Sequence, residues 1–235
     1  MTNKYKALSA LLSYPTAELK AAASDIRTVL LDDIPGPIWA LHKIDKLVDE
    51  IETLDLYELQ ERYVFLFDRT RSLSLHLFEH VHGESRDRGQ AMVDLKTLYA
   101  EGGLEIGATE LPDFLPLFLE YLSTRPDGQA SVLLNEPLSV IVALKERLEK
   151  RKTPYAAVFR VLEAIAGQSP SQSELNDLRK APDDDPNDLE ALDAAWEDEP
   201  VTFGPSDEAC PKVSQMLDRM NTGETANTIA RTARG

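Results

Sequence analysis

Apolar residues recur three and four positions apart along nearly the whole of this 235-residue chain, and this spacing constrains the fold most. Residues at these separations share one face of an α-helix, whereas a half-buried strand alternates apolar and polar residues. Residues 38–51 show the pattern most fully, with isoleucine, leucine or valine at positions 38, 41, 44, 47, 48 and 51. Runs with period two are scarce. The sequence therefore predicts an all-α protein.

Residues that start or stop helices divide this pattern into segments. Asp55, followed by Glu58, predicts a capped helix start, because an aspartate side chain accepts hydrogen bonds from the first free backbone N–H groups. Asp113 and Asn135 are expected to cap two later starts, and Gly167 is expected to end a helix. The helices predicted in this way cover residues 5–14, 19–30, 38–51, 56–67, 86–99, 114–123, 138–152, 155–166, 174–180 and 189–196. We therefore expect a single-domain bundle of roughly ten helices.

Composition indicates the size of the core and the surroundings of the protein. A hydrophobic fraction of 43% is enough for one sizeable core, and the single Cys210 cannot form a disulfide within the chain. The start of the chain lacks a signal-peptide pattern, and no apolar run approaches the ~18 residues that suggest a membrane span. These features predict a cytoplasmic protein that does not insert into a membrane.

The composition changes from about Pro182 onward, toward aspartate, glutamate, proline and small residues, as in APDDDPND and WEDEPVTFGPSDEACP. Few large apolar residues remain there to support packing, so order is expected to weaken. We expect residues 1–198 to form the helical domain and residues 199–235 to form an acidic, weakly ordered tail.

The net charge of −16 bears on the partners of the protein. A phosphate backbone is repelled by such an excess of carboxylates, so nucleic acid is not an expected partner, whereas basic partners are favoured. The charge also has a simpler interpretation, which is solubility. The sequence has more aromatic residues in two predicted helices than one narrow buried stripe requires, namely Phe65, Phe67, Phe114 and Phe118. Part of this aromatic surface is therefore expected to be exposed to receive an amphipathic helix.

The stretch HLFEHVHGESRDRG, residues 76–89, holds three of the four histidines of the chain and begins with the pattern H-x-x-E-H. In one class of zinc peptidases, two histidines one helical turn apart hold the metal and the glutamate acts as general base. On a continuous helix, His76 and His80 would lie on one face beside Glu79, but a third ligand is not evident. Histidines at a helix end, with His76 packed on aromatic neighbours, account for the same residues. A zinc-dependent hydrolase that uses residues 76–80 therefore remains an alternative.

Two blocks of the sequence resemble a known family. LFEHVHGESRDRGQAMVDL, residues 77–95, and ELPDFLPLFLEYL, residues 110–122, closely resemble the nitrate reductase molybdenum cofactor assembly chaperones, also called delta subunits, of the TorD-like redox enzyme maturation proteins. The likeness is weaker at LLSYPTAEL and LFDRTRS and returns at LDAAWEDEPVTFG. The resemblance implies a single all-helical domain without catalytic activity, in which the H-x-x-E-H pattern is incidental.

The resemblance also implies a partner and a task. The protein would bind the N-terminal amphipathic segment of the catalytic (alpha) subunit of respiratory nitrate reductase in the cytoplasm, before membrane docking. It would assist insertion of the molybdenum bis-guanine-dinucleotide cofactor without holding this cofactor stably, and cofactor biosynthesis proteins are further candidate partners. A chaperone for a different molybdoenzyme remains an alternative.

The client-binding residues that the resemblance implies lie in three stretches. They are Tyr63, Phe67 and Asp68 in YVFLFD; Glu79, His80, His82, Glu84, Arg86 and Asp87 in the long block; and Glu110, Pro112 and Asp113 in the loop motif. Many family members have Pro-Asp-His in the last motif, whereas Phe114 replaces the histidine here. Because histidine titrates near cytoplasmic pH, we expect protonation of His80 or His82 to tune client release.

Overall fold

The computed structural model describes residues 3–34, 38–81, 86–107, 110–188 and 190, and for residues 38–41, 86 and 87 it describes the helical backbone alone. The described residues form ten α-helices and two short 3₁₀-helices. In chain order these are α1 (Asn3–Leu11), α2 (Ala17–Asp33), α3 (Ile38–Thr53), α4 (Leu56–Phe67), the 3₁₀-helices η1 (Arg71–Leu73) and η2 (Leu77–Glu79), α5 (Arg86–Glu101), α6 (Leu115–Ser123), α7 (Asp127–Asn135), α8 (Leu138–Lys150), α9 (Ala156–Ala166) and α10 (Gln172–Lys180). The all-α prediction is confirmed.

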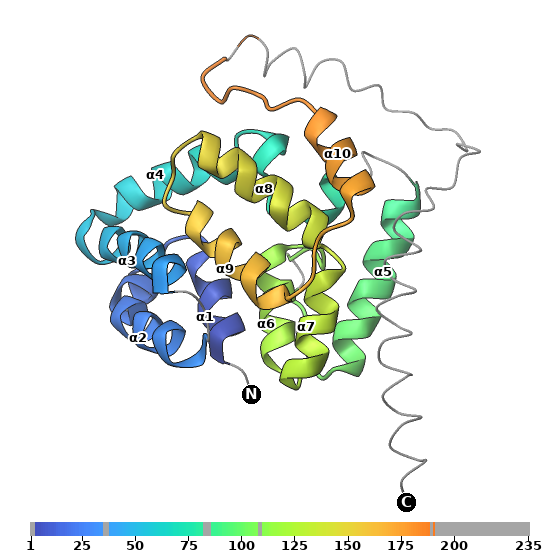
Figure 1. Cartoon of the computed structure of the whole chain (residues 1–235), viewed down its shortest axis with the longest axis horizontal. Helices are drawn as coiled ribbons and strands as arrows, with labels where there is room; N and C mark the ends of the chain where they lie inside the picture. The colour runs from blue at the N-terminus through green and yellow to red at the C-terminus, as the bar shows by residue number, and fades with distance from the viewer. Residues whose placement is uncertain (1–2, 35–37, 82–85, 108–109, 189, 191–235) are drawn as a thin grey trace, which may run out of the picture.

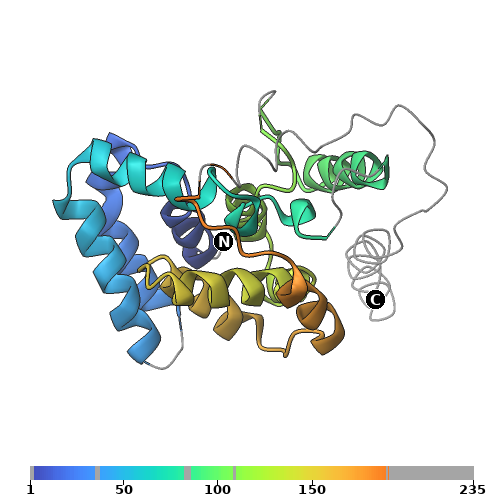
Figure 2. The same ribbon diagram turned by 90° about the horizontal axis from the view of Figure 1, so that it is seen from above.

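The helices α1 and α9 lie at the centre of the bundle (Figure 1). Helix α1 packs against α2 and α6, while α9 packs against α3, α7 and α8. Helix α5 lies at the opposite end of the molecule from α2 and α3, as Figure 2 also shows. The buried apolar residues form one continuous core that extends from Tyr5 in α1 to Leu175 in α10.

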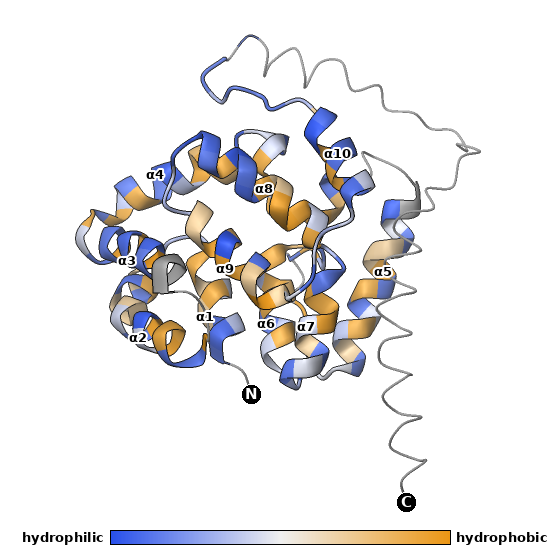
Figure 3. Ribbon diagram, in the orientation of Figure 1, coloured by the Kyte–Doolittle hydropathy of each residue, from blue (hydrophilic) through white to orange (hydrophobic). Residues whose placement is uncertain are grey.

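The apolar spacing explains which helix faces meet. Figure 3 shows hydrophobic residues along the facing sides of α6, α8 and α9, whereas α10 and the segment after it are largely hydrophilic. Among the described residues, no helix is long and apolar enough to cross a membrane. The domain boundary expected at residue 198, the tail at 199–235 and all of the helix predicted at 189–196 except residue 190 lie outside the described residues.

Two of the predicted helix boundaries are confirmed by the local geometry. The Asp55 side chain accepts a hydrogen bond from the backbone N–H of Tyr57 at 2.8 Å and so caps α4. Gly167 ends α9 with a φ of 74°, a left-handed conformation that an L residue adopts only at a cost.

Two other boundary predictions are wrong. Asp113 does not cap α6, because Phe114 occupies the N-cap position without a side-chain hydrogen bond and the Asp113 carboxylate bonds elsewhere. Asn135 does not open α8, because it is the last residue of α7, a helix that the sequence did not predict. The adjacent Asp127 and Gly128 suggest a turn, yet Asp127 begins α7 and forms an ion pair of 2.8 Å with Lys4 of α1.

The continuous helix through the histidines that the zinc alternative requires is not formed. His76 has extended backbone and forms an isolated antiparallel β-bridge with Phe114, and only the three residues of η2 are helical between His76 and His80. The two histidines therefore are not related by one turn of an α-helix, and the geometry on which the zinc alternative depends is not formed.

Candidate functional site

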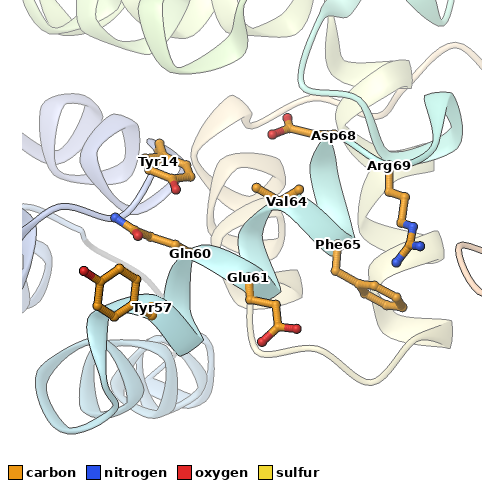
Figure 4. A pocket seen from close by; sticks show the side chains of 8 residues that line it. All are labelled: Tyr14, Tyr57, Gln60, Glu61, Val64, Phe65, Asp68 and Arg69. Atoms are coloured by element: carbon orange, nitrogen blue, oxygen red, sulfur yellow. The ribbon is translucent and has the colours of Figure 1, made fainter.

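An open groove runs along the outer side of α4 and has a volume of about 570 Å³. Its lining residues come from α4, from the turn after it and from the segment that follows α1. They are Tyr14, Tyr57, Gln60, Glu61, Val64, Phe65, Asp68 and Arg69, which Figure 4 shows on one side of the helix. We call this feature the α4 groove. Its volume lies within the range of pockets that bind ligands.

The helix α4 is apolar on two faces, which explains the groove. Leu59 and Tyr63 point into the core, where the Tyr63 hydroxyl donates a hydrogen bond of 2.9 Å to the carbonyl of Leu12. Tyr57 and Val64 are seven residues apart and lie on the outer face, where they are 80% and 41% exposed. A surface helix normally places polar residues on that face. The exposed apolar face of α4 is therefore a candidate binding surface.

The segment after α1 closes one side of the groove. Tyr14 is 46% exposed, and its ring contacts the Tyr63 ring edge to face at a centroid distance of 5.6 Å. The Gln60 side chain donates a hydrogen bond of 2.9 Å to the carbonyl of Pro15 and fixes this segment against α4. Of the seven large hydrophobic residues that are exposed in the described chain, three line this one groove.

Carboxylates border the apolar surface. Glu61 and Asp68 are exposed and lie seven residues apart on α4 and at its C-terminal end. Although the Asp68 side chain is accessible to solvent, protein atoms crowd its carboxylate, and this desolvation raises the pKa of Asp68, while the nearby His76 opposes the shift. The guanidinium of Arg69 lies 5.7 Å from the ring centre of Phe65 at the same end. The groove thus combines an apolar floor with a charged rim of two carboxylates and one guanidinium.

A buried carboxylate, that of Asp113, organises the segment next to this end of the groove. Asp113 is fully buried; its two oxygens accept hydrogen bonds from His76 Nδ1 and from the backbone N–H of Phe78, both at 3.1 Å. Its carbonyl accepts from the N–H of Leu77 at 3.0 Å. The N–H of Leu115 in turn donates to the carbonyl of Leu75 at 2.8 Å. These bonds join the histidine segment to the start of α6.

The two described histidines of this segment have opposite electrostatic environments. Burial favours the neutral form of His76, but the hydrogen bond and charge of Asp113, together with Glu79, outweigh it and raise the pKa of His76. Burial lowers the pKa of His80, whose Nε2–H donates a hydrogen bond of 2.7 Å to the carbonyl of Ser74. The His76 ring also packs against the Phe114 ring at a centroid distance of 5.3 Å.

The structure separates the predicted site residues into several groups. Asp68 lines the α4 groove, whereas Tyr63 and Phe67 are buried behind it and pack against each other and against Tyr155. Of the four phenylalanines expected to be partly exposed, Phe65 lines the groove and Phe114 is half-buried, but Phe67 and Phe118 belong to the core.

The remaining predicted residues belong to the polar network or lie outside it. Glu79 accepts from Arg88 at 3.4 Å, and the buried Pro112 accepts from the Tyr99 hydroxyl at 2.9 Å, while Glu110 is exposed. His82 and Glu84 lie outside the described residues, and Arg86 and Asp87 are described only by their helical backbone in α5. Within the described residues, no group of three or more histidine, cysteine, aspartate or glutamate side chains is arranged to hold a metal ion.

Sequence reasoning did not select Tyr14, Tyr57 or Val64 as site residues. The sequence does contain an indication of this surface, because α4 has apolar residues on its buried face and also at Tyr57 and Val64 on its outer face. The contribution of Tyr14 is not visible in its own segment, since it depends on how the turn after α1 packs against α4.

The described residues form an all-helical protein in which α4 has an exposed apolar face bordered by Glu61, Asp68 and Arg69. Among known proteins, the family described as nitrate reductase delta subunit matches residues 31–160. The chain belongs to this family.

Individual relatives extend the similarity beyond that range. The nitrate reductase molybdenum cofactor assembly chaperone NarJ of Escherichia coli strain K12 is 39% identical over 198 residues, which are 83% of each chain. The protein named "Probable nitrate reductase molybdenum cofactor assembly chaperone NarW" of the same strain is 38% identical over 84% of this chain and 82% of its own. The nitrate reductase-like protein NarX of Mycobacterium tuberculosis strain H37Rv is 30% identical over 65% of this chain but only 22% of its own.

The Asp113 network predicts a large loss of stability when its carboxylate is removed. Asp113→Ala leaves the buried N–H of Phe78 without its acceptor and His76 without its charged partner, so we expect the free energy of unfolding to fall by about 3 kcal/mol. Glu110→Ala removes an exposed carboxylate three residues away and should change this free energy by less than about 0.5 kcal/mol. Urea denaturation of both variants checks this, and equal losses would contradict the role of Asp113.

The opposite pKa shifts of the two histidines predict opposite pH dependences. The contribution of His76 to stability is full below its usual pKa of about 6.5 and is lost as pH rises through its raised folded-state pKa. The contribution of His80 is full above about pH 6.5 and declines as pH falls through its lowered folded-state pKa. The stability loss caused by His76→Gln should therefore be larger at about pH 6 than at about pH 8.5. The loss caused by His80→Gln should instead be smaller at about pH 6 than at about pH 8.5. Urea denaturation across this range measures both; parallel trends would contradict the assignment.

Proposed function

We propose that this protein is an assembly chaperone for a respiratory nitrate reductase and that it binds the N-terminal amphipathic segment of the catalytic (alpha) subunit in the α4 groove. The names of the relatives from Escherichia coli support the role in nitrate reductase assembly. The exposed apolar face of α4 carries the proposed mode of binding, because a short amphipathic helix is the ligand that suits such a groove.

Apolar contact supplies the attraction in this proposal. A helix that lies along α4 would place residues of its own apolar face against Tyr14, Tyr57 and Val64. Removal of apolar surface from water contributes about 25 cal/mol per Å². Loss of freedom on association costs about 4–15 kcal/mol and offsets most of the gain from a groove of this size. The net affinity is therefore modest, as suits a chaperone that must release its client.

Charge selects the client and speeds its approach. Glu61 and Asp68 border the groove and outnumber Arg69, in a chain of net charge −16, so lysine or arginine residues on the polar side of the incoming helix meet a net negative surface. Such exposed pairs add little affinity, but an acidic segment would be repelled. This combination favours a basic amphipathic segment over other apolar helices.

The site residues divide between contact and support in this proposal. Asp68 meets the client directly, and Tyr63 and Phe67 hold α4 in place from the core side. Asp113 and Pro112 fix the segment that contains Glu79 and His80. Direct contact with the client stays a prediction for the remaining residues, which are Glu79, His80, His82, Glu84, Arg86, Asp87 and Glu110.

The bound state would serve cofactor loading. The chaperone keeps the catalytic subunit open in the cytoplasm while the molybdenum bis-guanine-dinucleotide cofactor is inserted, and it leaves before the complex docks at the membrane. In this scheme the chain performs no catalysis and holds no cofactor stably, and cofactor biosynthesis proteins are its further partners.

A peptide titration tests the groove directly. Val64→Glu places a charge in the middle of the apolar floor, so we expect it to weaken binding of a peptide with the N-terminal sequence of the catalytic subunit at least tenfold, or about 1.4 kcal/mol. Val132→Glu makes the same change at a valine of similar exposure on α7, 49% against 41%, and should leave the affinity unchanged. Isothermal titration calorimetry measures both affinities.

Three outcomes would count against this proposal. Equal effects of the two substitutions would exclude the α4 groove as the binding site. An absence of binding to the unaltered protein would exclude this peptide as the client segment. Tighter binding of the N-terminal peptide of another molybdoenzyme would reassign the client while keeping the site.

A further inference from the structure

A second pocket, with a volume of about 350 Å³, lies between α3 and the turn that joins α8 to α9. It shares no lining residue with the α4 groove. Helices α3 and α9 pack against each other at this place, so the pocket is formed by elements that are far apart in the sequence. We call it the basic pocket because of the side chains that line it.

The charge of the basic pocket is opposite in sign to the net charge of the protein. Four permanent cations line it, namely Lys43, Lys46, Lys152 and Arg160, together with His42 and a single carboxylate, that of Glu149. The chain as a whole has a net charge of −16. Because acidic residues outnumber basic residues in this chain, a cluster of positive charge is not expected from the amino-acid composition. It creates a local field that attracts anions.

The available carboxylates do not neutralise this cluster. Arg160 pairs with Glu149 at 2.5 Å, and Lys46 is 3.9 Å from Glu50, which does not line the pocket. His42 is 3.7 Å from Asp45, outside the pocket lining. Lys43 and Lys152 form no ion pair with any residue in the described part of the chain. Two positive charges therefore remain available to a ligand.

The backbone at Lys152 supports a role for its side chain. Its N–H donates to the carbonyl of Glu149 at 3.0 Å, and the N–H of Thr153 donates to that of Leu148 at 3.2 Å, which are the two bonds of a Schellman motif at the end of α8. Lys152 occupies the position where glycine is preferred, and its φ is 55°. A lysine here costs stability that glycine would not. The positive charge of Lys152 is thus present at a position where the backbone conformation favours glycine.

We propose that the basic pocket binds a small molecule that carries two or more linked phosphates. The lysines supply point charges, and the Arg160 guanidinium supplies a planar set of donors that matches phosphate oxygens. The positive end of α9, which begins at Ala156 beside the pocket, adds to the attraction. A single carboxylate would use only part of this charge, whereas a diphosphate engages several cations together. The volume of about 350 Å³ lies within the range of pockets that bind small molecules.

The test uses inorganic pyrophosphate and ADP as probes and the full-length protein in isothermal titration calorimetry. Lys152→Gly should weaken pyrophosphate binding about tenfold while leaving the melting temperature equal or higher, because glycine favours the left-handed backbone. Lys43→Gln should weaken binding to a similar extent. Lys96→Gln removes the same charge from an exposed position on α5, outside the pocket, and should leave binding unchanged.

The outcomes separate this proposal from its alternatives. Tighter binding of ADP than of pyrophosphate assigns the site to a nucleotide, and equal affinities assign it to the phosphates alone; both support the proposal. The proposal is overturned if neither probe binds at millimolar concentration, or if all three variants bind equally well. Binding of an oligoglutamate peptide in place of both probes, with the same dependence on Lys43 and Lys152, would overturn it in favour of an acidic protein segment. None of these results bears on peptide binding in the α4 groove.

Discussion

The buried carboxylate of Asp113 is the interaction on which the arrangement of the segment next to the groove depends. It lies at the start of α6 and binds His76 and the backbone of Phe78, two residues that no regular helix would bring to it. The described part of the segment between α4 and α5, residues 68–81, contains two 3₁₀ turns, and the position of its second half depends on these bonds and on the burial of Leu77 and Phe78. Loss of these bonds would release the histidine segment from the start of α6 and change the surroundings of Asp68, whose pKa is influenced by His76.

Helix α4 combines two requirements that normally conflict. Its inner residues must stabilise the core, which they do through Leu59, Tyr63 and Phe67. Its outer residues must leave apolar surface in water, which costs free energy until a partner covers it. Hydrogen bonds from Gln60 to Pro15 and from Tyr63 to Leu12 join α4 to the chain at the end of α1 and so fix the position of the helix. A rigid, exposed apolar helix face is therefore available before any client arrives, which lowers the ordering cost of binding.

The sequence predicts those features that local chemistry decides. Asp55 and Gly167 act within a few residues of themselves, and both predictions are confirmed. Asp113 was expected to cap α6 for the same local reason, but its carboxylate has partners 35 and 37 residues away, which the sequence does not reveal. Periodicity finds the apolar face of α4 that is buried, yet it does not say that the outer face stays exposed, because exposure depends on which other segments cover it. The position of Phe114 against His76 and the convergence of α3 with the α8–α9 turn depend on tertiary packing in the same way.

Direct contact between α4 and the client is the central claim, and site-specific photocrosslinking in cells measures it. A photoreactive benzoylphenylalanine in place of Tyr57, which is 80% exposed at the groove, should crosslink to the N-terminal segment of the nitrate reductase catalytic subunit. The same group in place of Val132 on α7 should not. A crosslink from position 132 without one from position 57, or a crosslink from position 57 that maps elsewhere on the catalytic subunit, would contradict the account.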